Sequence, residues 1–213
     1  MAGVPGVSPA KVVILGAGVV GRNALQMAVG MGAEVCIFDR DIDRLRQIDL
    51  FYGNQVRTFY SDSLLIEHEI SEADVVIGAV LLPGAAAPKL VTKEMVKKMK
   101  AGAVVVDVAI DQGGCFETSR PTTHADPTFL VDGVLHYCVA NMPGAVARTS
   151  TFALTNATYP YVEALANRGV IKALSIDHHL RDGLSIHKGV LTSEPVAQAQ
   201  GLDYSEPEEL LVA

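Results

Sequence analysis

The chain has 213 residues, enough for one large domain or for one domain with an appendage, and it is 49% hydrophobic and 19% charged. That composition is typical of a globular protein and excludes an intrinsically disordered one. The formal net charge of −7 at pH 7 comes without a basic cluster. It argues against nucleic acid or an anionic membrane surface as a partner, and no apolar run reaches the length of a membrane-spanning helix.

Residues 1–10 are expected to form a linker, because Met1–Pro9 contains two prolines and two glycines. This segment lacks the charged and apolar regions of a signal peptide. The three cysteines are odd in number and share no metal-ligand spacing, which fits a reducing compartment. We therefore expect a cytoplasmic protein. We expect no metal site, because no acid or cysteine completes a ligand spacing with the histidines near the C-terminus.

The segment Lys11–Gly21 predicts a strand that runs into a G-x-G-x-x-G turn and then a helix. Gly16 permits the tight turn, Gly18 lets the backbone approach a pyrophosphate, and Gly21 lets the helix pack closely on the strand. The helix N-terminus supplies unpaired N–H groups for the anion. The strand before the glycines, the helix after them and an acidic residue at the end of the next strand are all features of a dinucleotide-binding site, so we predict such a site. A glycine-rich turn that binds nothing is the alternative.

The acidic residue is Asp39, which is placed to accept hydrogen bonds from both hydroxyl groups of an adenosine ribose. Its charge repels a 2′-phosphate, so NAD is favoured over NADP. The next residue, Arg40, weakens this inference, because an arginine at that place tolerates the phosphate.

The chain up to residue 148 continues to alternate strands and helices. The expected strands are Glu34–Asp39, Val56–Tyr60, Asp74–Val80, Ala103–Ala109 and Val134–Ala140. The expected helices are Val19–Met31 with Gly32 as its C-cap, Asp41–Leu50, Ser63–Ser71 and Thr92–Lys100. This order predicts the α/β class with a doubly wound parallel sheet, the Rossmann fold, over residues 11–148.

Residues 149–213 are expected to form a long C-terminal helix and a short helical tail. The helix over Thr149–Asn167 carries little charge, and Pro160 is expected to kink it or to begin a second segment. Its apolar side chains predict packing against another domain or subunit.

Two polar residues follow strands at the edge where open α/β sheets bind their ligands. Asp111 comes just past the fifth expected strand, so its carboxylate is expected to face the nicotinamide end of the crevice. Asn141 ends the sixth and is expected to hydrogen-bond the carboxamide. Asp107 falls inside a strand, where a structural role is favoured. Composition alone is equally consistent with Asp111 and Asn141 being turn residues.

Six strings of the sequence resemble bacterial alanine dehydrogenases. They are GVPGV from Gly3, VIGAVLLPGA from Val76, APKLVT from Ala87, DVAIDQGGCFETSRPTTH from Asp107, VANMPGAV from Val139 and TSTFALTNAT from Thr149. The resemblance covers essentially the whole chain. The related transhydrogenase α-subunit shares the fold and part of the pattern, but it lacks an aspartate at the place of Asp111.

The resemblance implies a role for each matched position. The phosphates of NAD would be surrounded by Gly16, Gly18, Val19 and Gly21, and the ribose would be bound by Asp39. The adenosine would lie near Arg44 and Ser61, and the dinucleotide cleft would include Val80 and Leu81. The nicotinamide and substrate would lie near Asn141, Met142 and Asp111, the last being the family's active-site carboxylate. Arg40 replaces a residue that is usually apolar, which bears on affinity at the adenine side.

The reaction implied by the resemblance converts L-alanine, NAD and water reversibly into pyruvate, ammonia and NADH. Family members hold the substrate-binding lysine and arginine and the catalytic histidine in an N-terminal domain, before the residues that match Gly3. The chain is therefore expected to be the NAD-binding portion, with residues 149–213 returning to that substrate domain. Family members assemble as homo-oligomers, commonly hexamers. The alternatives are a free-standing NAD(H)-sensing module without catalysis and a transhydrogenase α-subunit-like domain.

Overall fold

The computed structural model describes residues 1–80 and 87–211. These residues form two compact units, each described here by itself. One comprises residues 1–80 and 87–142, and the other comprises residues 143–211. At the start of the first unit, residues 1–10 fold back on themselves. Val4 and Val7 form an isolated antiparallel bridge, and the Ala10 N–H donates to the Met1 carbonyl at 2.9 Å.

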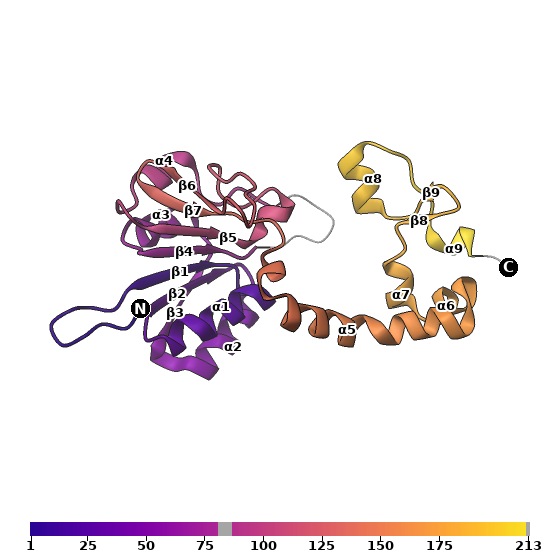
Figure 1. The fold of residues 1–213 in the computed structure, drawn as a ribbon, viewed down its shortest axis with the longest axis horizontal. Helices are drawn as coiled ribbons and strands as arrows, with labels where there is room; N and C mark the ends of the chain where they lie inside the picture. The colour runs from indigo at the N-terminus through magenta and orange to yellow at the C-terminus, as the bar shows by residue number, and fades with distance from the viewer. Residues whose placement is uncertain (81–86, 212–213) are drawn as a thin grey trace. The chain divides into compact units, whose positions relative to one another are not determined.

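A seven-stranded sheet in the order β3-β2-β1-β4-β5-β7-β6 forms the centre of the first unit (Figure 1). The parallel strands are β1 (Lys11–Leu15), β2 (Glu34–Asp39), β3 (Val56–Tyr60), β4 (Val75–Gly78), β5 (Val104–Asp107) and β7 (Val134–Tyr137). The edge strand β6 (Thr128–Val131) pairs antiparallel with β7. The chain adds β2 and β3 on one side of β1 and the later strands on the other. The doubly wound fold is thus confirmed, and its topological switch point lies between β1 and β4.

Both faces of β1 are buried, so alternate residues of this strand contribute to two different cores. Val12 and Ile14 pack with side chains of α1 (Val19–Gly30) and α2 (Ile42–Tyr52). Val13 and Leu15 pack with side chains of α3 (Ser63–Ser71) and α4 (Lys93–Lys97). In Figure 1 the first helix pair lies in the lower part of this unit and the second pair in its upper left part. Because helices cover both faces, the ends of the strands are the part of the sheet open to a ligand.

Several expected boundaries need correction. The strand β4 ends at Gly78, β7 ends at Tyr137, and β5 gives way after Asp107 to the 3-10 helix η2 (Val108–Gln112). The helix α1 ends at Gly30 with Met31 as its C-cap, so Gly32 lies one residue beyond the C-cap and is not the cap itself, which corrects the expectation. The short helix α4 begins after Thr92, whose hydroxyl caps it, and ends at Lys97. The strand β6 was not expected, because its four residues are too few to show a clear alternation.

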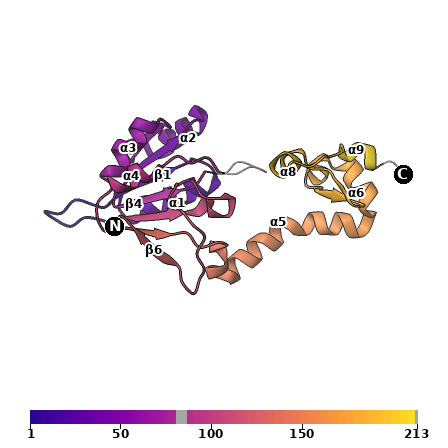
Figure 2. The same cartoon turned by 90° about the horizontal axis from the view of Figure 1, so that it is seen from above.

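The second unit begins with the 3-10 helix η3 (Met142–Val146) at the unit boundary and the long helix α5 (Ala147–Arg168). The expected long helix is present and runs through Pro160 as one element, so the alternative of a second segment is wrong. The rest comprises α6 (Val170–Ile176), α7 (His178–Asp182), β8 (Ile186–His187), β9 (Val190–Leu191), α8 (Glu194–Gln200) and α9 (Pro207–Leu210). Figure 2 shows α6 and α9 near the C-terminal end of α5. Within the described ranges, no helix has the length and apolarity to cross a membrane.

Candidate functional site

The turn after β1 needs glycine at two of its three motif positions for reasons of backbone packing. Gly16 has φ +105, and a Cβ there would lie 2.7 Å from the Ala79 carbonyl oxygen. A Cβ on Gly21 would lie 1.8 Å from the Gly16 carbonyl oxygen. Distances this short do not occur between real atoms, so these two glycines let the end of β1, the start of α1 and the end of β4 meet.

Gly18 is different, because nothing in the described protein requires a glycine there. It is the N-cap of α1, its φ of −69 suits any residue, and a Cβ built on it meets no atom of the described residues within 4 Å. No side chain caps α1, and its first turn contains no acidic residue. The first turn of a helix has N–H groups without intrahelical partners. The space over Gly18 therefore leaves the positive end of α1 accessible to an anion.

The carboxylate of Asp39 joins the ends of β1 and β2. Its Oδ2 accepts the Ala17 N–H at 2.6 Å, and its Oδ1 accepts the Asp41 N–H at 2.8 Å. The side chain is 13% exposed, so it reaches the surface at the switch point. Each carboxylate oxygen can accept more than one hydrogen bond, so acceptor capacity remains for a ligand hydroxyl.

Arg44 and Ser61 lie beside Asp39. The Arg44 Nη1 is 3.8 Å from Oδ2 of Asp39, and its Nε is 3.2 Å from Oδ2 of Asp41. Asp41 also caps α2, which fixes the first turn that carries Arg44. The Ser61 N–H donates to the Asp39 carbonyl at 2.9 Å. Arg40 is exposed.

The half-buried Val80 follows β4 and packs against the core that lies between the sheet and the helices α3 and α4. One of its methyl carbons would lie 3.2 Å from a Cβ on Gly16, so Val80 borders the glycine turn. Val19 is exposed at the start of α1. The prediction for Leu81 falls outside the described residues.

Asp107 is the last residue of β5, not an internal one as expected, and it is fully buried. Its Oδ2 accepts the Cys115 N–H at 2.9 Å and the Ser119 hydroxyl at 2.6 Å. A buried carboxylate with several donors stabilises the loop that supplies them, so these contacts support the expected structural role. Burial, with the nearby Asp107 charge, raises the pKa of the Cys115 thiol, so this cysteine stays protonated.

Asp111 lies on η2, directly beyond the carboxyl end of β5, and its side chain is exposed. Among the residues that the structure describes, none donates a hydrogen bond to its carboxylate. A solvent-facing carboxylate at this edge can interact with a small cationic or protic ligand.

Asn141 lies beyond β7 rather than at its end, which corrects the expected position. It is exposed and has φ +54, in the left-handed region that asparagine tolerates better than most residues. Its carbonyl is 3.1 Å from Nε2 of His124. The neighbouring Met142 is half-buried. Because β5 and β7 are adjacent parallel strands, Asp111 and Asn141 follow them at the same edge of the sheet.

Sequence reasoning missed Lys89 and the amide of Ala17. Lys89 donates hydrogen bonds to the loop between Asp111 and Ser119. Neither contact has a local sequence signal, because each joins segments far apart in the chain.

Comparison with known proteins places these features in a family. Residues 1–194 match the family model described as "Alanine dehydrogenase/PNT, C-terminal domain". The alanine dehydrogenase of Halomonas elongata is 59% identical over 98% of this chain and 56% of its own length. That of Bacillus subtilis is 56% identical over 99% of this chain and 56% of its own length. The chain thus spans a little over half the length of these relatives.

Solved structures agree with this placement. An L-alanine dehydrogenase structure superposes with a TM-score of 0.86 at 52% identity, covering 94% of this chain and 55% of that chain. A transhydrogenase from Sinorhizobium meliloti superposes with a TM-score of 0.72 at 27% identity, covering 91% of this chain and 53% of that chain. The dehydrogenase is thus nearer in both sequence and structure.

Proposed function

The chain belongs to the alanine dehydrogenase/PNT C-terminal domain family, and on that premise we infer that it is the NAD-binding portion of an alanine dehydrogenase. The observation that carries the inference is the pairing of an accessible helix N-terminus over Gly18 with Asp39 at the next strand end. Among the described residues, none packs against the position of a Gly18 Cβ, whereas an approaching pyrophosphate needs that space.

The residues present fit a dinucleotide from end to end. The positive end of α1 would hold the pyrophosphate, with Gly16 and Gly21 shaping the turn beneath it. Asp39 would accept the ribose hydroxyls, and its charge would disfavour a 2′-phosphate, so NAD is proposed over NADP despite the neighbouring Arg40. Arg44 and Ser61 would border the adenosine, and Val19, Val80 and Leu81 would line the rest of the cleft. When bound, NAD would supply the oxidant for the substrate amine.

Asp111 would act at the other end of the site. Oxidation of L-alanine passes through a positively charged imine that water attacks, giving pyruvate and ammonia. An exposed carboxylate just beyond β5 can stabilise that cation and orient the attacking water by accepting its proton in a hydrogen bond. Asn141 and Met142 would contact the nicotinamide from the neighbouring strand end. The residues that bind the substrate carboxylate are proposed to lie in the N-terminal domain of the family.

Two measurements on the purified chain test this proposal. The first is a fluorescence titration with NADH. The second is alanine-dependent NAD reduction by the chain alone and by the chain supplied with the N-terminal part of the Halomonas elongata relative. We expect binding by the chain and turnover only with the added part, because positioning groups for alanine are then complete. Failure to bind NADH contradicts the proposal, and binding without turnover in both samples favours an NAD(H)-sensing module.

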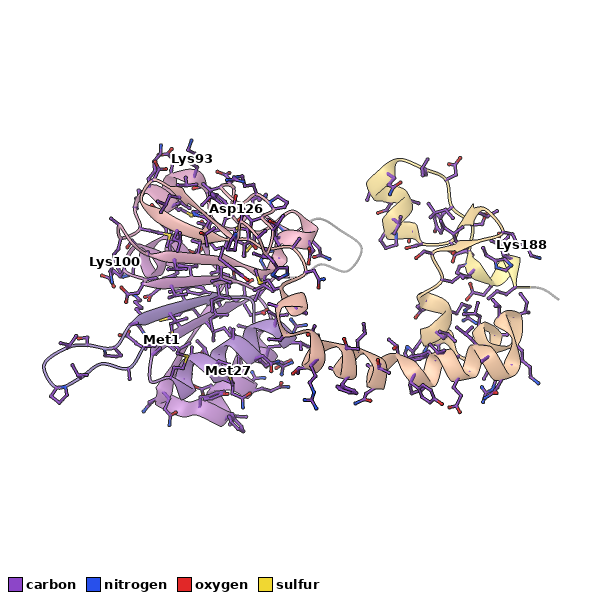
Figure 3. All side chains as sticks on the ribbon, in the orientation of Figure 1. Met1, Met27, Lys93, Lys100, Asp126 and Lys188 are labelled. Atoms are coloured by element: carbon purple, nitrogen blue, oxygen red, sulfur yellow. The ribbon has the colours of Figure 1, made fainter. Side chains whose placement is uncertain are left out.

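Asp111→Asn tests the catalytic carboxylate in the same assay. It is expected to lower turnover at least tenfold with little change in NADH affinity. Asp126→Asn is the matched control, because Asp126 is an exposed aspartate of the same unit on the loop before β6 (Figure 3). Unchanged turnover in Asp111→Asn would contradict the assigned role.

A homo-oligomer is also proposed, of the kind found in the family. The long helix α5 exposes apolar side chains along its length: Phe152, Leu154, Tyr159, Tyr161 and Val162. Such a surface favours burial against another subunit or domain. Light scattering of the purified chain measures its mass, and a monomer at micromolar concentration would contradict this part of the proposal.

A further inference from the structure

Lys89 is an exposed residue, yet its ammonium group donates hydrogen bonds to three carbonyls of one loop. Its Nζ donates to the carbonyl oxygens of Gly113 at 2.6 Å, Gly114 at 2.9 Å and Phe116 at 3.1 Å. A lysine ammonium has three N–H donors, so these three carbonyls account for all of them. A surface lysine normally keeps its charge in water, which makes this arrangement a specific one.

Asp107 holds the same loop through the loop's backbone N–H groups, whereas Lys89 binds the loop's carbonyl groups. It accepts the N–H groups of Cys115 and Phe116, at 2.9 and 3.4 Å. Gly113 and Gly114 have φ values of +89 and +75, and a Cβ on Gly114 would lie 2.5 Å from Oδ2 of Asp107. A cation on the carbonyls and an anion on the amides thus hold a turn that only glycines adopt readily.

The held turn closes the 3-10 helix that carries Asp111. The Gly113 N–H donates to the Ile110 carbonyl at 2.9 Å, and the Gly114 N–H donates to the Ala109 carbonyl at 3.0 Å. Two of the three residues whose carbonyls bind Lys89, Gly113 and Gly114, therefore also supply the amides that close η2. We propose that Lys89 is a positioning residue that fixes η2 and, through it, the direction of the Asp111 carboxylate. This inference rests on the role proposed above for Asp111.

Amide exchange tests the hold directly. Lys89→Met keeps most of the apolar stem and removes every donor. Water can replace the donor at the exposed Gly113, whereas Gly114 and Phe116 are buried residues whose carbonyls lose a donor. We therefore expect the fold to persist while η2 opens more often. The Gly113 and Gly114 amides are expected to exchange about tenfold faster, since charge-assisted hydrogen bonds are lost. Lys89→Arg, which restores charged donors, is expected to recover part of the protection.

The matched control is Lys93→Met, which makes the same change on an exposed lysine at the start of α4 (Figure 3). It is expected to leave the exchange of both glycines unchanged. Exchange of Gly113 and Gly114 in Lys89→Met within twofold of the wild type would overturn the proposal, whatever the turnover.

Kinetics then separate positioning from a merely structural role. With the N-terminal part of the relative supplied, Lys89→Met is expected to lower kcat for alanine about tenfold and to leave NADH affinity within twofold. Faster exchange with unchanged kcat overturns the positioning role. An Asp111→Asn variant with full activity refutes the role of Asp111 instead. The amide exchange of Gly113 and Gly114 then still tests whether Lys89 holds the turn. A wild-type sample without turnover contradicts both roles of Asp111 and Lys89.

Discussion

Gly18→Ala is expected to separate dinucleotide binding from folding. A Cβ at this position meets no atom of residues 1–80 or 87–211 within 4 Å, and φ is −69. Replacing glycine by alanine at a helix N-cap costs about 1 kcal/mol or less in the free energy of unfolding. The same methyl group occupies the space assigned to the pyrophosphate. NADH affinity is therefore expected to fall about tenfold or more, which corresponds to about 1.4 kcal/mol.

Gly21→Ala is expected to do the opposite and to destabilise the fold itself. Its Cβ would lie 1.8 Å from the Gly16 carbonyl oxygen, well inside contact distance. Backbone cannot rotate away as a side chain does, so α1 must move off β1. Overpacking a core typically costs about 1–3 kcal/mol, and a backbone clash of this size is expected at or above the upper end.

The assay combines urea unfolding, followed by circular dichroism, with NADH fluorescence titration of the same preparations. Gly30→Ala is the matched control, because Gly30 is exposed at the end of α1 and a Cβ there meets nothing within 4 Å in the part of the chain that the structure describes. It is expected to change neither binding nor stability by a large amount. A Gly18→Ala chain that binds NADH within twofold of the wild type would refute the reasoning, as would a Gly21→Ala chain with wild-type stability.

Three further predictions follow from the carboxylates. Asp39→Asn is expected to destabilise the chain by about 1–2 kcal/mol, because one of two backbone N–H groups loses its acceptor, and urea unfolding measures this effect. The same variant is expected to narrow the preference for NADH over NADPH, which competition titration measures. Asp107→Asn is expected to open the loop it holds, so that Cys115 reacts faster with a thiol reagent; an unchanged rate would contradict its role. Burial raises the pKa of Glu69, but hydrogen bonds and charge from Lys11, 2.9 Å away, outweigh this and lower the pKa overall. The difference in unfolding free energy between the wild type and Glu69→Gln is therefore expected to be largest above the ordinary carboxyl pKa of 4.5 and to shrink as the pH falls through the pKa of Glu69 in the folded chain. Urea unfolding at several pH values measures this difference, and a difference that does not change with pH would contradict the prediction.

The sequence pattern predicted the central layers of the first unit closely. The bounds of β2, β3 and α3 were predicted as observed, and β1 began at the expected residue. These elements are set by local patterns: apolar runs for buried strands and capping residues such as Asp62 before a helix. The glycine motif and Asp39 likewise predicted the switch point, because each glycine has a local steric reason.

The parts that sequence reasoning missed depend on contacts between distant segments. Where β4, β5 and β7 end depends on which neighbour remains to pair with, and β6 exists only because β7 is beside it. The two backbone hydrogen bonds of Asp39 join turns after different strands.

The fold class, the order of the layers and the strand ends where a dinucleotide would bind could be predicted from the sequence, because periodicity and glycine sterics act over a few residues. Which charged groups hold the turn after η2 depends on the fold. Lys89 reaches that turn from the segment before α4 and Asp107 from the end of β5, and their hydrogen bonds to its backbone leave no trace in local composition. A hydrogen bond to a main-chain carbonyl is available at every residue, so only folding selects which one is used.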